Sequence, residues 1–273
     1  MKDDPSGPVN SPWLASAIAG LGRYGVSSIA MSARVGALLI GTLAILLRGG
    51  SDGQRISPSA VLDRIVDMGP QAFGLTLRFG VSIGLVIGIL LESWLGWGDL
   101  LDFAIEKTTV LMVEQVAPLF VAIMVAAHSG GALAADLGIM VATHEIDALR
   151  SLGLSPQRLL VAPSILGALL AVPLLTLTMI FCIIMTLAIY LNLAGLGSIA
   201  LIVTLALNAM EPTTLGTALA KAALFGPMIA AIAAAQGLVV QPTTRLVGNG
   251  VSSATVTMIS SILLSNALLT LAF

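Results

Sequence analysis

One carboxylate and one proline lie inside a strongly apolar stretch of the chain, at Glu114 and Pro118. A carboxylate in apolar surroundings must be paired, protonated or in contact with water, and a proline frees a backbone carbonyl and permits a kink. Glu114 is therefore a candidate functional group. A role limited to bonding a neighbouring helix stays open.

The histidines do not match a metal or catalytic motif. His128 and His144 flank Asp136 at spacings that differ from compact ligand patterns such as His-Glu-x-x-His. His128 and Ser129 are adjacent, so on a helix their side chains point about 100° apart, which is poor geometry for a base and a nucleophile. We predict no metal site and no catalytic residue, and we rank an intramembrane hydrolase last.

The sequence also lacks a phosphate-binding loop of the form Gly-x-x-x-x-Gly-Lys-Ser/Thr. We therefore expect this chain to bind no cofactor itself. Any energy from ATP and Mg²⁺ must enter through a partner.

A short amphipathic helix is predicted between residues 143 and 153. Its signals are a capping threonine, acids in the first turn, a basic residue in the last turn and a terminal glycine. They are Thr143, Glu145, Asp147, Arg150 and Gly153. Ile146, Leu149 and Leu152 form its apolar side. The helix is too short to span a membrane, so it either lies on the surface or gives a separate motor protein a rigid element to hold.

Gly80, Gly84 and Gly88 recur every fourth residue, so they share one face of a helix. Such a face lets another helix approach closely. Plain helix packing is the simplest interpretation, and a moving or substrate-facing seam is the alternative.

The composition requires a membrane to hold these elements. The 273 residues are 57% hydrophobic and 10% charged, with a mean hydropathy of +1.03, whereas soluble domains carry about 25% charged residues. The 28 glycines favour closely packed helices. The net charge of −2 gives no basic surface for nucleic acid.

Apolar stretches near the length of about 20 residues that crosses a bilayer predict an all-α membrane protein with about five transmembrane helices. The stretches are 73–91, 108–128, 165–191, 215–237 and 253–273. Residues 199–210 are too short to cross and predict a short helix outside the membrane or at its far interface.

The region before these spans is expected to form interfacial helices. Residues 13–47 are apolar but contain Arg23 and Arg34, which favours the interface, and a full span over 29–47 is the alternative. Ser57 and Pro58 predict the start of a separate short surface helix. The N-terminus lacks the pattern of a cleavable signal, so we expect it to remain in the cytoplasm.

Basic residues set the predicted orientation. Arg150 and Arg158 lie in the 129–160 loop, whereas the 92–107 loop contains more acids than bases. The positive-inside rule then places the N-terminus and the 129–160 loop in the cytoplasm.

An ordered set of motifs runs from Glu114 to Pro163: an acid and proline, a glycine-rich exit, an acid-Leu-Gly, a methionine and an Ile-Asp-Ala-Leu core. The positions are Glu114, Pro118, Gly130, Asp136 to Gly138, Met140, and Ile146, Asp147, Ala148 and Leu149. In the order of these motifs, the chain resembles the MlaE family of permeases. These are the membrane subunits of ABC systems that move lipids between bacterial membranes. Weaker similarity, including Gly80 to Gly88 and Lys221, extends over a permease domain at 73–273, after an N-terminal region at 1–72.

The resemblance implies a permease in the bacterial inner membrane that pairs with a second copy of itself. Each copy would dock a cytoplasmic ABC ATPase through the 143–153 coupling helix. An MCE-domain protein would cap the outer face, and a STAS-domain protein can join the ATPase. Phospholipid or a similar lipid would occupy a cavity lined partly by the first span and the Glu114 region. A proton-coupled carrier of an apolar substrate, titrating at Glu114, Asp136 or His128, is the alternative.

The chain departs from the family pattern at several positions. The family usually has Arg where His128 stands, Glu where Asp136 stands and often Arg where Val113 stands. A Glu-Gln pair is usual where this chain has His144 and Glu145. These departures bear on headgroup contacts and on the identity of the lipid.

Overall fold

The computed structural model describes residues 33–42, 44, 58–95, 101–239 and 244–272. These residues are mainly helical and contain no strand. The helices are α2 (Pro58–Leu95), α3 (Leu101–Leu111), α4 (Ala117–Val125), α5 (Gly131–Ala142), α6 (Glu145–Ser151), α7 (Ala162–Leu193), α8 (Ile199–Ala209), α9 (Pro212–Gly237) and α10 (Thr244–Ala272). Three π-helical turns join some of them: η1 (Met112–Val116), η2 (Ala126–Gly130) and η3 (Gln157–Val161).

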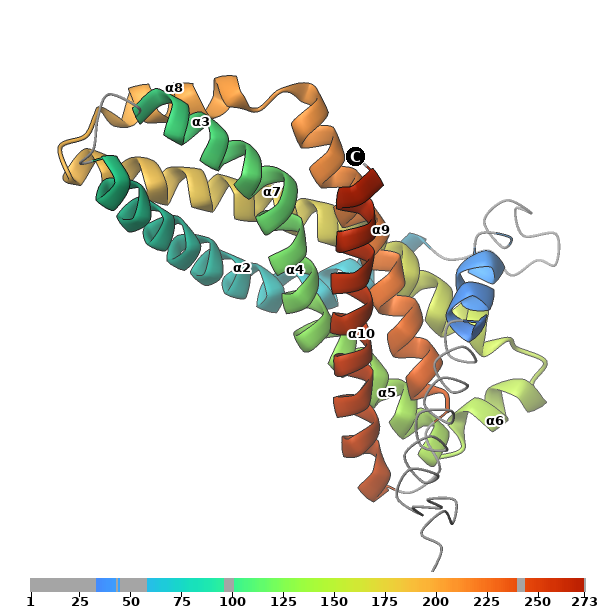
Figure 1. Cartoon of the computed structure of the whole chain (residues 1–273). Helices are drawn as coiled ribbons and strands as arrows, with labels where there is room; N and C mark the ends of the chain where they lie inside the picture. The colour runs from blue at the N-terminus through green and yellow to red at the C-terminus, as the bar shows by residue number, and fades with distance from the viewer. Residues whose placement is uncertain (1–32, 43, 45–57, 96–100, 240–243, 273) are drawn as a thin grey trace, which may run out of the picture.

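The prediction of five membrane spans is confirmed within the described residues. The spans are Ala72–Ser93, Asp102–Ala142, Gln157–Leu193, Pro212–Gly237 and Gly250–Leu271. The short helix predicted at 199–210 is α8, which Ser198 caps by accepting a hydrogen bond from the Leu201 N–H at 3.2 Å. α3 and α8 lie at one end of the molecule and α6 lies at the other (Figure 1).

The separate surface helix predicted to open at Pro58 is wrong, because α2 runs without a break from Pro58 to Leu95. The apolar stretch predicted to begin at residue 73 is therefore the continuation of the same helix. The helix also crosses the boundary that we predicted at residue 72.

Of the N-terminal region before α2, the structure describes a helix at Ala33–Thr42. The ten described residues are about 15 Å long. A side chain at Gly41 would collide with Gln157, so this helix lies against the start of η3. Most of the region predicted as interfacial helices, 13–47, and most of the alternative span over 29–47 lie outside the described residues.

A seam of glycines joins α2 to α7. A Cβ at Gly80 would lie 2.7 Å from the Cβ of Cys182, and one at Gly84 would lie 2.8 Å from the carbonyl oxygen of Ile183. A Cβ at Gly88 would lie 2.6 Å from the ring of Tyr190. The three glycines therefore face a helix of the same chain, and α2 and α7 run in the same direction.

Gly84→Ala is expected to lower the thermal unfolding midpoint of the purified protein in detergent. The added methyl would have to displace the α7 backbone, and overpacking of this kind costs about 1–3 kcal/mol. Gly74→Ala is the matched control, because Gly74 lies in the same helix with nothing within 4 Å of an added Cβ. Equal midpoints for the two variants would contradict the close packing.

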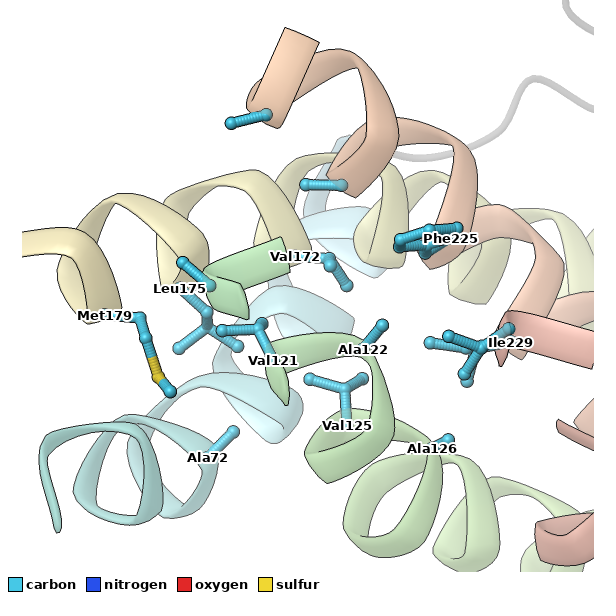
Figure 2. Close-up of a cluster of buried hydrophobic side chains, with 14 of the residues drawn as sticks. Ala72, Val121, Ala122, Val125, Ala126, Val172, Leu175, Met179, Phe225 and Ile229 are labelled. Carbon is cyan, nitrogen blue, oxygen red and sulfur yellow. The ribbon is translucent and has the colours of Figure 1, made fainter. Parts of the chain in front are cut away.

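The core lies where α4, α7 and α9 meet α2 (Figure 2). Val121, Val172, Phe225 and Ile229 are each at most 2% exposed in this cluster. A side chain at Gly226 would collide with the carbonyl oxygen of Ala168, so α7 and α9 also touch backbone to backbone. This packing fixes the relative positions of the second and fourth spans, which carry the polar residues described next.

Candidate functional site

The π-helical turn η1 lies within the second span and contains Glu114. Pro118 follows in the first turn of α4 and has no N–H to donate to the carbonyl of Glu114, four residues earlier. Lys221 of α9 supplies the missing donor, with its Nζ 3.3 Å from the Glu114 carbonyl oxygen. The proline and the lysine therefore act on the same backbone atom.

Side chains from three helices join this contact. The Oε1 atom of Gln115 accepts hydrogen bonds from Lys221 Nζ at 3.0 Å and from Thr270 Oγ1 of α10 at 2.9 Å. Thr217 of α9 donates to Glu114 Oε1 at 3.5 Å. We call Glu114, Gln115, Thr217, Lys221 and Thr270 the intramembrane polar cluster.

The charge of Lys221 is buried without an ion pair. Its side chain is 3% exposed, and within the described part of the chain it contacts no carboxylate at ion-pair distance. The ammonium has three N–H donors, and its two acceptors are the neutral Gln115 amide and the Glu114 carbonyl. The carboxylate of Glu114 attracts the ammonium from nearby. The third N–H donor of Lys221 has no acceptor among the residues that the structure describes.

Two further buried polar atoms on the second span and α10 lack partners among the described residues. They are Oδ1 of Asn266, one turn before Thr270 on α10, and Oγ1 of Thr109, one turn before Val113. Unpaired buried polar atoms are costly, and such atoms often mark a site for water or a ligand. A few polar groups in an apolar bundle suit a molecule with a polar head and apolar tails.

The short helix predicted from Thr143 to Gly153 is present, but it begins later than expected. It starts at Glu145, and its N-cap is His144 in the left-handed conformation with φ +59°. Thr143 instead ends α5, and its hydroxyl lies within hydrogen-bond distance of two acceptors, the Ile139 carbonyl and Glu145 Oε1. The capping role predicted for Thr143 is therefore wrong, because the left-handed residue puts the turn between the two helices one position later.

The end of α6 has the predicted glycine. Gly153 has φ +75°, and its N–H donates to the Arg150 carbonyl while the Leu154 N–H donates to that of Leu149. This pair of bonds is a Schellman motif, in which glycine takes the left-handed position.

The apolar side of α6 is divided between the bundle and the exterior. Ile146 is 3% exposed, whereas Leu152 is 73% exposed. Asp147 lies 3.4 Å from both His144 and Arg150, and all three side chains are more than half exposed. Such exposed pairs contribute at most about 1 kcal/mol. α6 thus offers an exposed leucine beside loosely paired charges.

The other predicted residues do not join the intramembrane polar cluster. Gly130 is buried where a Cβ would lie 2.7 Å from the sulfur of Met258 on α10, and Gly138 is buried in α5. Asp136 is exposed on α5, about 33 Å along the helical rod from Glu114 at 1.5 Å per residue. No group of three possible metal ligands occurs among the residues that the structure describes.

Sequence reasoning missed Gln115 as a site residue. Gln115 directly follows Glu114 in the same apolar stretch, and it is uncharged, so it did not stand out as an ionisable group.

The family model described as Permease MlaE matches residues 61–272. The chain is 29% identical over 211 residues to Protein TRIGALACTOSYLDIACYLGLYCEROL 1, chloroplastic, of Arabidopsis thaliana, covering 76% of this chain and 59% of that protein. It is 26% identical over 226 residues to a probable ABC transporter permease protein of Synechocystis, covering 78% and 81%.

A third relative is the intermembrane phospholipid transport system permease protein MlaE of Haemophilus influenzae, 26% identical over 168 residues, with 60% of each chain covered. The matches thus span less than two thirds of the Arabidopsis and Haemophilus proteins. The family model nevertheless covers well over half of this chain, from α2 to the end of α10. The chain belongs to the MlaE permease family.

Proposed function

We propose that this multi-pass membrane protein is the permease subunit of an ATP-driven ABC transporter that moves phospholipid or a similar lipid between the inner and outer membranes of a bacterium. The observation that carries the proposal is the intramembrane polar cluster, in which both hydrogen-bond acceptors of the buried Lys221 ammonium are neutral. A lipid phosphate would complete the hydrogen bonds of that ammonium, while the acyl chains would lie against apolar helix surfaces. Membership of a permease family supports the same function.

We further infer the partners from the family and from the shape of the chain. A cytoplasmic ABC ATPase would bind α6, since an exposed leucine and a rigid capped helix suit a docking contact. A second copy would pack against this one. α10 supports this, because only 17% of its most apolar window is buried within one chain. An MCE-domain protein would receive or deliver lipid at the α8 end, and a STAS-domain protein would bind the ATPase.

The test is lipid transfer by the purified complex in liposomes. The chain is purified with the ATPase that accompanies it and reconstituted with a fluorescent phospholipid, and transfer to acceptor vesicles is measured with and without ATP. We expect transfer that requires ATP hydrolysis. Transfer driven by a pH gradient without nucleotide would instead support the proton-coupled carrier, and no lipid movement under either condition would contradict both.

A further inference from the structure

A polar groove opens at the end of the bundle that carries α3 and α8, where the second and fourth spans begin (Figure 1). Its volume is about 460 Å³, within the range of about 300–1,000 Å³ that ligand pockets occupy. α3 forms one wall, and α8 with the start of α9 forms the other. The polar residues that line the groove are Asp102, Glu106, Lys107, Asn208, Glu211 and Thr214. None of them belongs to the intramembrane polar cluster.

Thr214 provides the buried polar group of this groove. It is 6% exposed, and its hydroxyl makes no hydrogen bond with any residue that the structure describes. A buried threonine inside a helix can donate to the carbonyl four residues earlier, as Thr176 does to Val172. Thr214 has no helical carbonyl at that distance, because α9 begins at Pro212. Since an unsatisfied buried hydroxyl is costly, this one indicates a partner in the groove.

Two carboxylates of the groove have no cation beside them within the described part of the chain. Lys107 lies 3.0 Å from Glu106 and offsets that charge. Asp102 and Glu211 form no such ion pair, and Glu211 only accepts a hydrogen bond from the Thr213 hydroxyl at 3.2 Å. One of these acids comes from α3 and the other from the start of α9. A ligand with two positive charges would therefore offset a charge on each wall.

We propose that this groove binds a linear organic diamine, with one ammonium at Asp102 and the other at Glu211 and Thr214. Each ammonium supplies three N–H donors to these acceptors. A single metal ion fits less well, because no three possible metal ligands lie together among the described residues. Helix dipoles favour acids at the starts of α3 and α9 in any case, and the unsatisfied Thr214 hydroxyl is the observation that adds a ligand. This binding does not depend on the proposed transport.

The experiment measures the affinity of the full chain for putrescine, by saturation-transfer NMR titration in nanodiscs of uncharged phosphatidylcholine. Empty nanodiscs give the background. N-acetylputrescine, which keeps the chain but has one charge, and Mg²⁺, which has two charges at one point, are the comparison ligands. Glu92→Gln is the matched control for the groove variants, because Glu92 is an exposed acid at the end of α2 that does not line the groove.

Putrescine should bind about fivefold more tightly than N-acetylputrescine, which is the largest effect expected of one exposed ion pair. Asp102→Asn and Glu211→Gln should each weaken putrescine binding by the same factor. Thr214→Val keeps the shape of the side chain and should weaken binding about two- to tenfold, as expected for one hydrogen bond. Glu92→Gln should bind as the wild type does, and Mg²⁺ should displace putrescine no better than Na⁺ at the same ionic strength.

The proposal is overturned if putrescine shows no saturable binding, or if both amines bind equally well. Wild-type affinity in both Asp102→Asn and Glu211→Gln would also overturn it. Displacement by Mg²⁺ but not by Na⁺ would show a site for inorganic cations instead. If Glu92→Gln weakens binding as much as the groove variants do, the amine responds to the charge of this whole end of the molecule and the groove is not its site.

Discussion

Lys221→Met is expected to reduce lipid transport at least tenfold while leaving the protein folded. Methionine has a similar length and fills the same buried space, and the loss of a donor costs about 1–3 kcal/mol for each buried acceptor left unsatisfied, which is less than the stability of a typical folded protein. The change removes the donor to Gln115 and to the Glu114 carbonyl, both of which lie within 3.3 Å of the ammonium. A lipid phosphate would then lose its charged partner.

The measurement is ATP-dependent lipid transfer in liposomes, together with the ATPase rate and the thermal midpoint. Thr176→Val is the matched control, because it also removes a buried polar group, but one that bonds only to the Val172 carbonyl of its own helix. Transport by Lys221→Met at the wild-type rate would show that the intramembrane polar cluster serves packing alone. A lower midpoint without a change in transport per folded molecule would lead to the same conclusion.

Leu152→Asp is expected to release the ATPase from the purified complex. Leu152 is 73% exposed at the end of α6, and burying a leucine side chain at an interface contributes about 1.5–3 kcal/mol. Replacing it by a carboxylate removes that contribution and leaves a charge in an apolar contact, so affinity should fall at least tenfold. The fold of α6 should persist, because Ile146 and the Schellman motif at Gly153 are untouched.

Copurification and ATPase binding by titration measure this effect. Leu193→Asp is the control, since Leu193 is 81% exposed at the opposite end of the bundle, at the end of α7. If Leu152→Asp binds the ATPase as the wild type does, α6 is a surface helix without a docking role. Loss of binding in both variants would indicate a general defect rather than a local contact.

The spans were predictable from the sequence because a helix that crosses a bilayer must be apolar over about 20 residues. Length and hydropathy were enough to identify the five spans and to separate from them α8, which is apolar but too short to cross. The continuity of α2 from Pro58 to Leu95 did not follow from them, because hydropathy does not show whether a polar surface segment and the span after it form one helix.

The candidate site was predictable only in part. Glu114 and Pro118 stood out as polar and helix-breaking residues in an apolar run, and Lys221 was noticed only as part of the resemblance. Their relation could not be read from the sequence, because Lys221 meets the Glu114 carbonyl across 107 positions. The contact of Gln115 with Thr270 spans 155 positions. Similarly, the turn at His144 depends on a left-handed backbone that the residue type does not require.

The second span is a rod of 41 residues, about 60 Å long, and about two thirds of the way along it Gly130 packs closely against Met258 and Ile229. A stiff rod gripped at one point behaves as a lever. If the ATPase pulls on α6 at one end, the part of the span on the other side of Gly130 moves in the opposite direction. That movement carries Glu114 and Gln115 past Lys221 and Thr270. Opening on one side of the membrane would then be mechanically tied to closing on the other, without any hinge loop.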